Sequence, residues 1–224
     1  MGFGVTRIFD GVYRIGQNIA TQNMVEGTSV YSEQRISFEG KEYRIWDPNR
    51  SKVGAAIRKG MKEFLIGEGS KVLYLGAAEG TTISHLSDIV GKSGVIFGVD
   101  ISARSMRKFI YLCEKRPNIV PILGDASQPM TYKEHISGFS IDALVQDVSQ
   151  KNQAEIFLKN ARAYLKREGH GYLSIKARSI SASESAESIF RQETKKMENE
   201  FEILETIPLE PFEKEHEMVV GKKK

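Results

Sequence analysis

The chain has 224 residues, 40% of them hydrophobic, so it can bury the core of one large α/β domain or of a main domain with a small appendage. Its single cysteine excludes an internal disulfide framework, and its net charge of +3 is too small to indicate nucleic-acid binding by itself. With no apolar run long enough for a membrane span and no signal-peptide pattern, we expect a cytoplasmic protein without a membrane partner.

Residues 1–50 differ from the rest of the chain. Glycines separate short segments with the alternation typical of strands, at 12–15, 35–38 and 43–46. These segments predict a small antiparallel β module. A turn at 47–51 ends the module, and the spacing of apolar residues predicts a helix over 52–65 that opens a second domain, 51–224.

A basic strip runs from Arg35 to Lys62 and contains eight basic and three acidic residues. Such a strip binds the phosphate backbone of a nucleic acid or forms a solvated face without a partner. The sequence alone favours neither interpretation.

The segment 71–100 follows the pattern of strand, glycine turn, helix and strand, which is one β-α-β unit. Gly76 and Gly80 leave space where a helix N-terminus points outward, and Asp100 ends the second strand, where a carboxylate accepts from both hydroxyls of a ribose. The G-x-x-x-G spacing provides less for a pyrophosphate than the dinucleotide pattern, which favours S-adenosylmethionine over NAD. A tight turn followed by a solvated aspartate is the alternative for this stretch.

The alternation of strands and helices continues to the end of the chain. We expect strands at 72–75, 95–100, 119–123, 141–145, 171–175, 201–207 and 217–220, and helices at 81–90, 104–115, 153–166 and 183–199. They predict a doubly wound α/β sheet, mostly parallel, whose last pair includes an antiparallel strand. Because sites form at the carboxyl ends of such strands, the candidate site residues are Gly76, Asp100, Asp125, Asp147 and Lys176.

Four of the polar residues predict a reactive cluster. Asp147 and Lys176 end neighbouring strands, and Lys52 and His216 lie where they can reach the same rim. Two lysines beside a carboxylate can hold a phosphate and lower the pKa of one amine, which can then accept a proton. The transfer of a methyl group to a hydroxyl needs a group that accepts the hydroxyl proton and an alignment of the hydroxyl oxygen with the methyl group. Taken singly, each residue is equally a solvated charge, and His216 a structural histidine.

Six segments resemble the fibrillarin family of RNA 2′-O-methyltransferases and together run through nearly the whole chain. They are R-S-K-V-G-A-A-I (50–57), V-L-Y-L-G-A-A-E-G-T-T-I-S-H-L-S-D-I-V-G (72–91), P-I-L-G-D-A (121–126), Q-D-V-S-Q (146–150), S-I-K-A-R-S-I (174–180) and L-E-P-F-E-K-E-H (209–216). The resemblance is to the archaeal form, because the glycine/arginine-rich extension that directs eukaryotic members to the nucleolus is absent.

The resemblance implies a fold and a site. The fold is a seven-stranded, S-adenosylmethionine-dependent methyltransferase sheet of the Rossmann-like kind, preceded by the β module. The implied catalytic residues are Lys52, Asp147, Lys176 and His216, with no metal ion. The implied S-adenosylmethionine ligands are Gly76, Ala77, Gly80, Thr81, Thr82, Asp100, Asp125, Ala126, Asp147 and Gln150. The chain departs from the family in having Glu79 for Ser, Asp100 for Glu and Ser149 for Ala, and the shorter Asp100 is expected to loosen the ribose contact.

The resemblance also implies a function, the 2′-O-methylation of ribose in rRNA and tRNA by the catalytic subunit of a C/D-box guide ribonucleoprotein. The implied partners are a C/D-box guide RNA, the target RNA, a Nop-domain scaffold protein and, indirectly, a kink-turn-binding protein. Two alternatives stay open. One is a catalytically idle ribonucleoprotein subunit, which the retained lysines argue against, and the other is an NAD-type oxidoreductase, which the glycine spacing disfavours.

Overall fold

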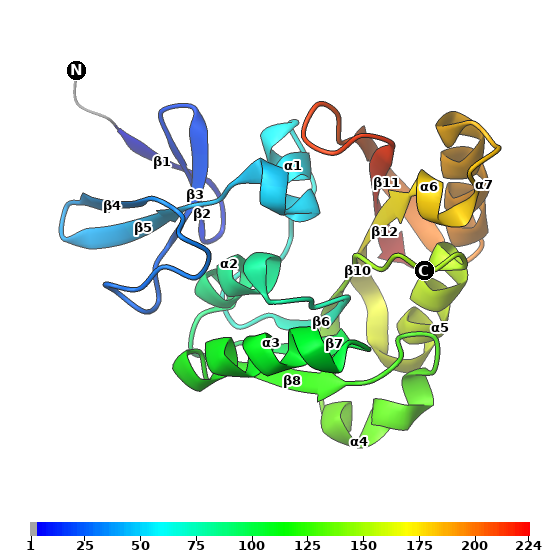
Figure 1. The fold of residues 1–224 in the computed structure, drawn as a ribbon, viewed down its shortest axis with the longest axis horizontal. Coiled ribbons are helices and arrows are strands. Elements are labelled where there is room, and N and C mark those ends of the chain that lie inside the picture. The colour runs from blue at the N-terminus through cyan, green and yellow to red at the C-terminus, as the bar shows by residue number, and fades with distance from the viewer. Residues whose placement is uncertain (1–3) are drawn as a thin grey trace.

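The computed structural model describes residues 4–224 and contains two sheets (Figure 1). The smaller one has the strand order β1-β2-β3-β5-β4, with every neighbouring pair antiparallel. Its strands are β1 (Val5–Phe9), β2 (Val12–Ile15), β3 (Asn18–Gln22), β4 (Arg35–Phe38) and β5 (Lys41–Ile45). The predicted antiparallel β module is confirmed. Strand β3 escapes prediction because Ile19, Ala20 and Thr21 are all buried, which removes the alternation that marks a half-exposed strand.

The larger sheet has the strand order β11-β12-β10-β9-β6-β7-β8, in which β12 is antiparallel to both neighbours and the other pairs are parallel. Its strands are β6 (Lys71–Leu75), β7 (Val95–Asp100), β8 (Ile119–Leu123), β9 (Ile141–Gln146), β10 (Leu165–Lys176), β11 (Phe201–Pro208) and β12 (His216–Lys223). The doubly wound, mostly parallel seven-stranded sheet predicted from the sequence is therefore confirmed.

Helices cover both faces of the larger sheet. They are α1 (Lys52–Arg58), α2 (Thr81–Val90), α3 (Ala103–Lys115), α4 (Lys133–Ile136), α5 (Gln153–Tyr164), α6 (Ala177–Ile180) and α7 (Ala186–Glu198), with short 3-10 turns η1 (Pro48–Arg50) and η2 (Pro129–Tyr132). Apolar side chains of α1, α2 and α3 share one buried cluster with one face of the sheet, and those of α5 and α7 share a second cluster with the other face. Among the described residues, no helix has the length and hydropathy needed to cross a bilayer.

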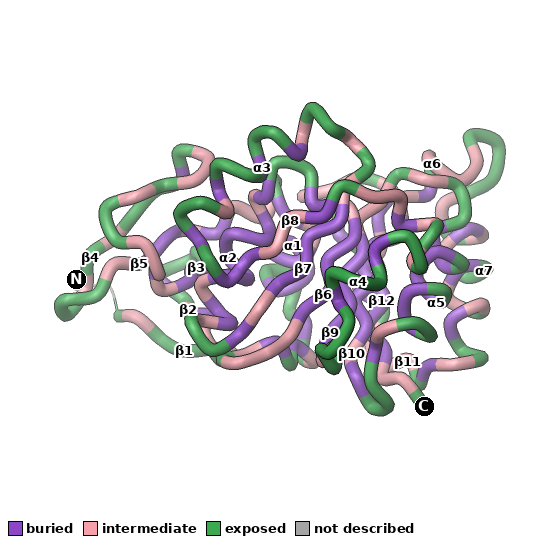
Figure 2. Tube along the Cα trace, turned by 90° about the horizontal axis from the view of Figure 1, so that it is seen from below, coloured by how far each residue is buried: buried purple, intermediate pink, exposed green. Residues whose placement is uncertain are grey.

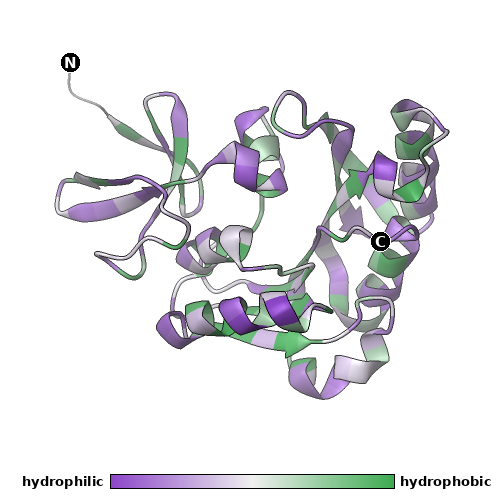
Figure 3. Cartoon of the chain, viewed as in Figure 1, coloured by the Kyte–Doolittle hydropathy of each residue, from purple (hydrophilic) through white to green (hydrophobic). Residues whose placement is uncertain are grey.

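The strands are buried because side chains on both faces are covered. Along β6, Val72 and Tyr74 pack in the first cluster, and Leu73 and Leu75 pack in the second. Figure 2 shows these central strands buried inside more exposed outer segments, and Figure 3 shows hydrophobic residues along them and hydrophilic residues along α3. This arrangement explains the continuous apolar runs in the sequence.

The helix predicted over 52–65 is wrong in its second half, because α1 ends at Arg58. The turn beyond it contains Gly60 at φ +98, outside the helical region. The segment that follows is held by tertiary hydrogen bonds. The amides of Lys62 and Glu63 donate to the Glu205 carboxylate, and the Leu65 amide donates to the Tyr172 hydroxyl.

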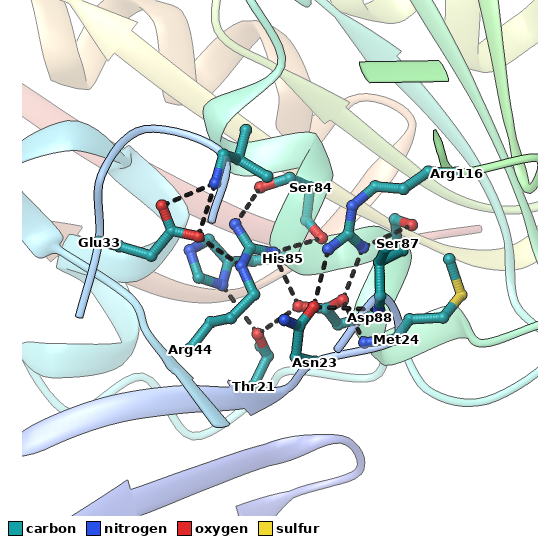
Figure 4. Close-up of polar contacts among 12 residues, drawn as sticks. Thr21, Asn23, Met24, Glu33, Arg44, Ser84, His85, Ser87, Asp88 and Arg116 are labelled. Carbon is teal, nitrogen blue, oxygen red and sulfur yellow. Dashed lines mark hydrogen bonds and ion pairs between the residues drawn. The ribbon is translucent and has the colours of Figure 1, made fainter. Parts of the chain in front are cut away.

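A buried ionic network fixes the β module against α2 (Figure 4). Arg44 of β5 is fully buried and pairs with Glu33 at 2.5 Å and with Asp88 of α2 at 2.8 Å. Asp88 also accepts from Arg116 at 2.6 Å. Burial and the two nearby arginines hold the pKa of His85 well below its usual value, so this ring stays neutral inside the network. The β module, α2 and Arg116 at the end of α3 therefore share one polar core.

Candidate active site

The predicted site residues gather at the carboxyl edge of the larger sheet. This follows from the parallel strands β6, β7, β8, β9 and β10, which all end at the same edge. Gly76 follows β6, Asp100 ends β7, Asp125 follows β8, Asp147 follows β9, and Lys176 ends β10.

The glycine turn after β6 is built around Gly76. The amides of Gly76 and Ala77 both donate to the carbonyl oxygen of Val99, at 2.9 and 3.0 Å, which folds the chain over β7. Gly76 adopts φ +88, and a Cβ atom there would lie 2.1 Å from the carbonyl oxygen of Asp147. Only glycine therefore allows the ends of β6 and β9 to approach each other this closely.

Gly80 and Thr82, which follow the turn, have structural contacts. Gly80 caps α2 at φ +88, and a Cβ atom there would lie 2.5 Å from Leu112 of α3. Thr82 is buried, and its hydroxyl donates to the Ser51 hydroxyl at 2.9 Å. The missing side chain of Gly80 thus allows α2 to pack on α3, and Thr82 links α2 to the start of α1.

Both oxygens of the Asp100 carboxylate accept from the backbone. Oδ2 accepts from the amide of Ala78 at 2.7 Å, and Oδ1 accepts from the amide of Ser102 at 2.8 Å. Asp100 thereby connects the glycine turn to the start of α3. A carboxylate has about four acceptor sites, so it can still accept from two hydroxyl groups.

A cavity of about 370 Å³ lies over these strand ends, within the usual size range of small-molecule sites. Six of the ten predicted cofactor residues line it: Gly76, Asp100, Asp125, Ala126, Asp147 and Gln150. The other four do not line it: Ala77, Gly80, Thr81 and Thr82. Sequence reasoning misses the lining residues Ala78 and Ile101. Ile101 is 64% exposed directly after Asp100, and an apolar residue at a strand end was the available signal.

One wall of the cavity holds two paired polar side chains. Asp125 Oδ1 accepts from the Ser127 amide at 2.8 Å and from Gln150 Nε2 at 3.2 Å. The hydrogen bond from Ser127, opposed by burial and aided by Gln150, lowers the pKa of Asp125. Gln150 Oε1 is buried without a hydrogen-bond partner within the described residues. An adenosine group fits these residues, since its amino group can donate to Gln150 and its ribose hydroxyls to Asp100.

Beside the cavity, Lys52 joins two carboxylates. Its Nζ lies 3.3 Å from Asp147 Oδ2 and 3.4 Å from Glu213 Oε1. Burial acts to lower the pKa of Lys52, but the charges of Asp147 and Glu213 outweigh it, and the pKa of this amine is raised. The amine of Lys52 is therefore held in its charged form. Glu213 was missed in the sequence, although it lies in the same segment as His216.

Lys176 and His216 face each other as register partners on β10 and β12. His216 Nδ1 lies 2.7 Å from the carbonyl oxygen of Lys214. Because a carbonyl only accepts, Nδ1 carries the proton of the neutral ring and Nε2 the lone pair. Nε2 is buried and has no hydrogen-bond partner in residues 4–224.

The structure brings the four predicted catalytic residues to one rim in two pairs, Lys52 with Asp147 and Lys176 with His216. The neighbouring strand ends of Asp147 and Lys176 predict that Asp147 fixes the position of the Lys176 amine. Within the described part of the chain, Asp147 has its ion pair with Lys52 and none with Lys176. Across the same residues, no three His, Cys, Asp or Glu side chains are placed to hold a metal ion.

The basic strip between Arg35 and Lys62 does not form one phosphate-binding face. Arg44 is buried in the ionic network, and Lys52 is paired in the rim. Arg50 and Arg58 are exposed close to Lys52 in sequence. The surface left for an RNA backbone is therefore smaller than the sequence count indicates.

Comparisons with known proteins agree on one family. The family model described as "Fibrillarin" matches residues 5–224. The "Fibrillarin-like rRNA/tRNA 2'-O-methyltransferase" of Pyrococcus horikoshii is 47% identical over 220 residues, 96% of each chain. The crystal structure of Aeropyrum pernix fibrillarin with natively bound S-adenosyl-L-methionine has a TM-score of 0.88 and 40% identity, covering 97% of both chains. A fibrillarin/Nop5p complex has a TM-score of 0.88 and 38% identity, covering 98% of this chain and 100% of that one.

Proposed function

The chain belongs to the fibrillarin family, and we propose that it methylates ribose 2′-hydroxyl groups of rRNA and tRNA with S-adenosylmethionine. One observation carries this proposal. Asp147 lines the cavity and also pairs with Lys52 at the reactive rim, so a single residue joins the cofactor site to the catalytic cluster.

The cofactor side of the site is held by strand-end residues. S-adenosylmethionine, when bound, supplies an electrophilic methyl group on a positively charged sulfur. Asp100 would accept from the ribose hydroxyls of the cofactor, and Asp125 and Gln150 would bind its adenine end. Gly76 lines the cavity, and its missing side chain lets the glycine turn approach the backbone of Asp147.

The acceptor side must remove a proton from the 2′-hydroxyl, which is a poor nucleophile while protonated. The raised pKa of Lys52 keeps that amine charged at neutral pH, so it serves as the cation that stabilises developing negative charge. Lys176 is our candidate for the amine that accepts the proton, and His216, whose Nε2 has no hydrogen-bond partner in residues 4–224, is the next.

The partners follow from the same family. The similar structure of a fibrillarin/Nop5p complex supports a Nop-domain protein as a direct partner. We extend the proposal to a C/D-box guide RNA, which selects the target nucleotide, and to a kink-turn-binding protein that acts indirectly. A net charge of +3 and the burial of Arg44 suit an enzyme that gains most of its RNA affinity from such partners. We propose the cytoplasm as its compartment.

Transfer of a labelled methyl group from S-adenosylmethionine tests this function. The purified protein is assayed alone and after assembly with a Nop-domain protein, a kink-turn-binding protein, guide RNA and target RNA. We expect incorporation only in the assembled particle, at one nucleotide set by the guide. Cofactor binding without transfer in the particle would indicate an idle subunit, and tight NADH binding would indicate an oxidoreductase.

A further inference from the structure

The backbone of Lys176 lies beyond the end of its neighbouring strand. The last register pair between β10 and β9 is Leu173 with Gln146, and β9 ends there. Strand β10 continues to Lys176. On the side that faced β9, the amide and carbonyl groups of Lys176 would lack a strand to bind.

The side chain of Gln153 takes the place of that strand. Its Oε1 accepts from the amide of Lys176 at 2.8 Å, and its Nε2 donates to the carbonyl oxygen of Lys176 at 3.2 Å. Gln153 is the first residue of α5 and has no exposed surface. One side-chain amide thus binds both polar groups of one backbone unit, as a neighbouring strand would do.

The register of β10 with β12 places Lys176 opposite His216. The next pair along the two strands is hydrogen-bonded, because the amide of Ala177 donates to the carbonyl oxygen of Glu215 at 3.1 Å. Hydrogen-bonded and non-hydrogen-bonded pairs alternate in an antiparallel ladder, so Lys176 and His216 form a non-hydrogen-bonded pair. In such pairs the Cα atoms lie about 4.5 Å apart and the side chains are closest, on the same face of the sheet.

Gln153 is itself held from two sides. The backbone carbonyl oxygen of Gln153 accepts from Gln146 Nε2 at 2.7 Å. The amide of the following residue, Ala154, donates to the buried carboxylate of Glu193 at 2.8 Å. The side-chain amide of Gln153 that binds Lys176 therefore extends from a backbone that is fixed by hydrogen bonds.

We infer that Gln153 is a positioning residue, which holds the backbone of Lys176 at the end of β10, opposite His216. The inference rests on the proposed function, in which Lys176 takes the proton of the 2′-hydroxyl. Gln153 does not touch substrate or cofactor in this assignment. It acts through Lys176 alone.

A double-mutant cycle in the assembled particle tests the inference, with single-turnover rates normalised to the number of sites that bind S-adenosylmethionine. Gln153→Leu removes both hydrogen bonds at similar volume, and we expect it to slow transfer by about tenfold or more. In the Lys176→Ala background the same change is expected to alter the residual rate by less than about twofold, because the two residues act as one unit. Equal effects in both backgrounds would overturn the inference. The control is Ser174→Ala, which lies on the same strand as Lys176. It removes a buried hydroxyl that has no hydrogen-bond partner in residues 4–224, so the rate should be unchanged.

Hydrogen exchange at the Lys176 amide gives a readout that does not require activity. We expect fast exchange of this amide in Gln153→Leu and slow exchange in the wild type, in Ser174→Ala and in Gln153→Glu, which retains an acceptor for it. Unchanged exchange in a folded Gln153→Leu protein would contradict the inference. An inactive wild-type particle would refute the proposed function, and exchange would then still decide whether Gln153 fixes Lys176.

Discussion

At the scale of single residues, the site depends on groups that serve two neighbours at once. Asp147 lines the cavity, pairs with Lys52 and presents its carbonyl oxygen to Gly76. Asp100 accepts from two backbone amides and lines the same cavity. Substitutions at these positions are therefore expected to change binding and catalysis by different amounts, depending on which contact is lost.

Asp100→Ala should weaken S-adenosylmethionine binding by about 1–3 kcal/mol, because ribose hydroxyls lose a charged acceptor and the glycine turn loses its bond from Ala78. Asp100→Asn keeps the size and one acceptor oxygen, so the loss should be smaller. Calorimetric titration measures both. Glu79→Ala removes an exposed carboxylate from the same turn and is the matched control. Equal affinity of Asp100→Ala and wild type would exclude Asp100 from the site.

Arginine substitutions separate the two lysines of the rim. Lys176→Arg keeps the charge but cannot accept a proton at neutral pH, so the single-turnover rate should fall on the order of 10²-fold with cofactor affinity unchanged. Lys52→Arg retains a cation beside Asp147 and Glu213 and should lose much less. A near-normal rate in Lys176→Arg would assign the proton to another group, with His216 next in line.

At the scale of elements, short connections bring distant segments to the rim. The hydroxyl of Ser51 caps α1 by accepting from the amide of Gly54, and it also accepts from Thr82 of α2. This double contact sets the first turn of α1, and with it Lys52, against the glycine turn. The conformation of the glycine turn depends on the close approach of β6 and β9 at Gly76.

Gly76→Ala measures that close approach. Both Gly76 (φ +88) and Gly138 (φ +91) are in the left-handed region, but an added Cβ meets the Asp147 carbonyl oxygen only at Gly76 and open space at Gly138. Each alanine should cost roughly 1 kcal/mol in unfolding free energy from backbone strain. Gly76→Ala should lose more, and should also weaken S-adenosylmethionine binding, whereas Gly138→Ala should not. Denaturant unfolding measures the free energies of unfolding, and calorimetry measures S-adenosylmethionine binding. Equal losses of unfolding free energy in the two variants would show that the contact with Asp147 is relieved at no cost.

At the scale of the whole molecule, a buried ionic network makes the β module part of the enzyme's core. Arg44 and Arg116, from opposite sides, share Asp88 of α2, and the neutral ring of His85 stacks on Trp46 at 4.9 Å between centroids. The same helix begins at the glycine turn, so the module is connected to the cofactor site through α2.

The network predicts a pH dependence of stability. The folded-state pKa of His85 lies well below its ordinary value of about 6.5, so below that pH the unfolded chain binds a proton that the folded chain does not. Stability is therefore complete above pH 6.5 and falls by up to about 1.4 kcal/mol per pH unit as the pH drops towards the folded pKa. His85→Gln should reduce this slope in urea unfolding between pH 7 and 5. Identical slopes in the two proteins would show that His85 is protonated in the folded state.

Much of this architecture is predictable from sequence, because strands and helices leave local signals. The spacing of apolar residues and the glycines locate the β-α-β unit, and parallel strands then bring Asp100 and Asp147 to one edge. Contacts between distant segments leave no such signal. Arg44 belongs to a basic strip by its neighbours, yet Glu33 and Asp88 bury it. Gln153 reads as an ordinary helix residue until the end of β9 exposes the backbone of Lys176 to it.

The proposed function identifies the ribose 2′-oxygen as the atom that accepts the methyl group. A target RNA with a single 2′-deoxyribose at the guided nucleotide lacks this atom and tests the proposal. Single-turnover transfer of labelled methyl by the assembled particle is measured on this RNA and on the unmodified target. We expect full transfer to the ribose target and no transfer to the deoxyribose target, with equal binding of both. Label incorporated into the deoxyribose target at the guided nucleotide would place the methyl group on the base and contradict the account.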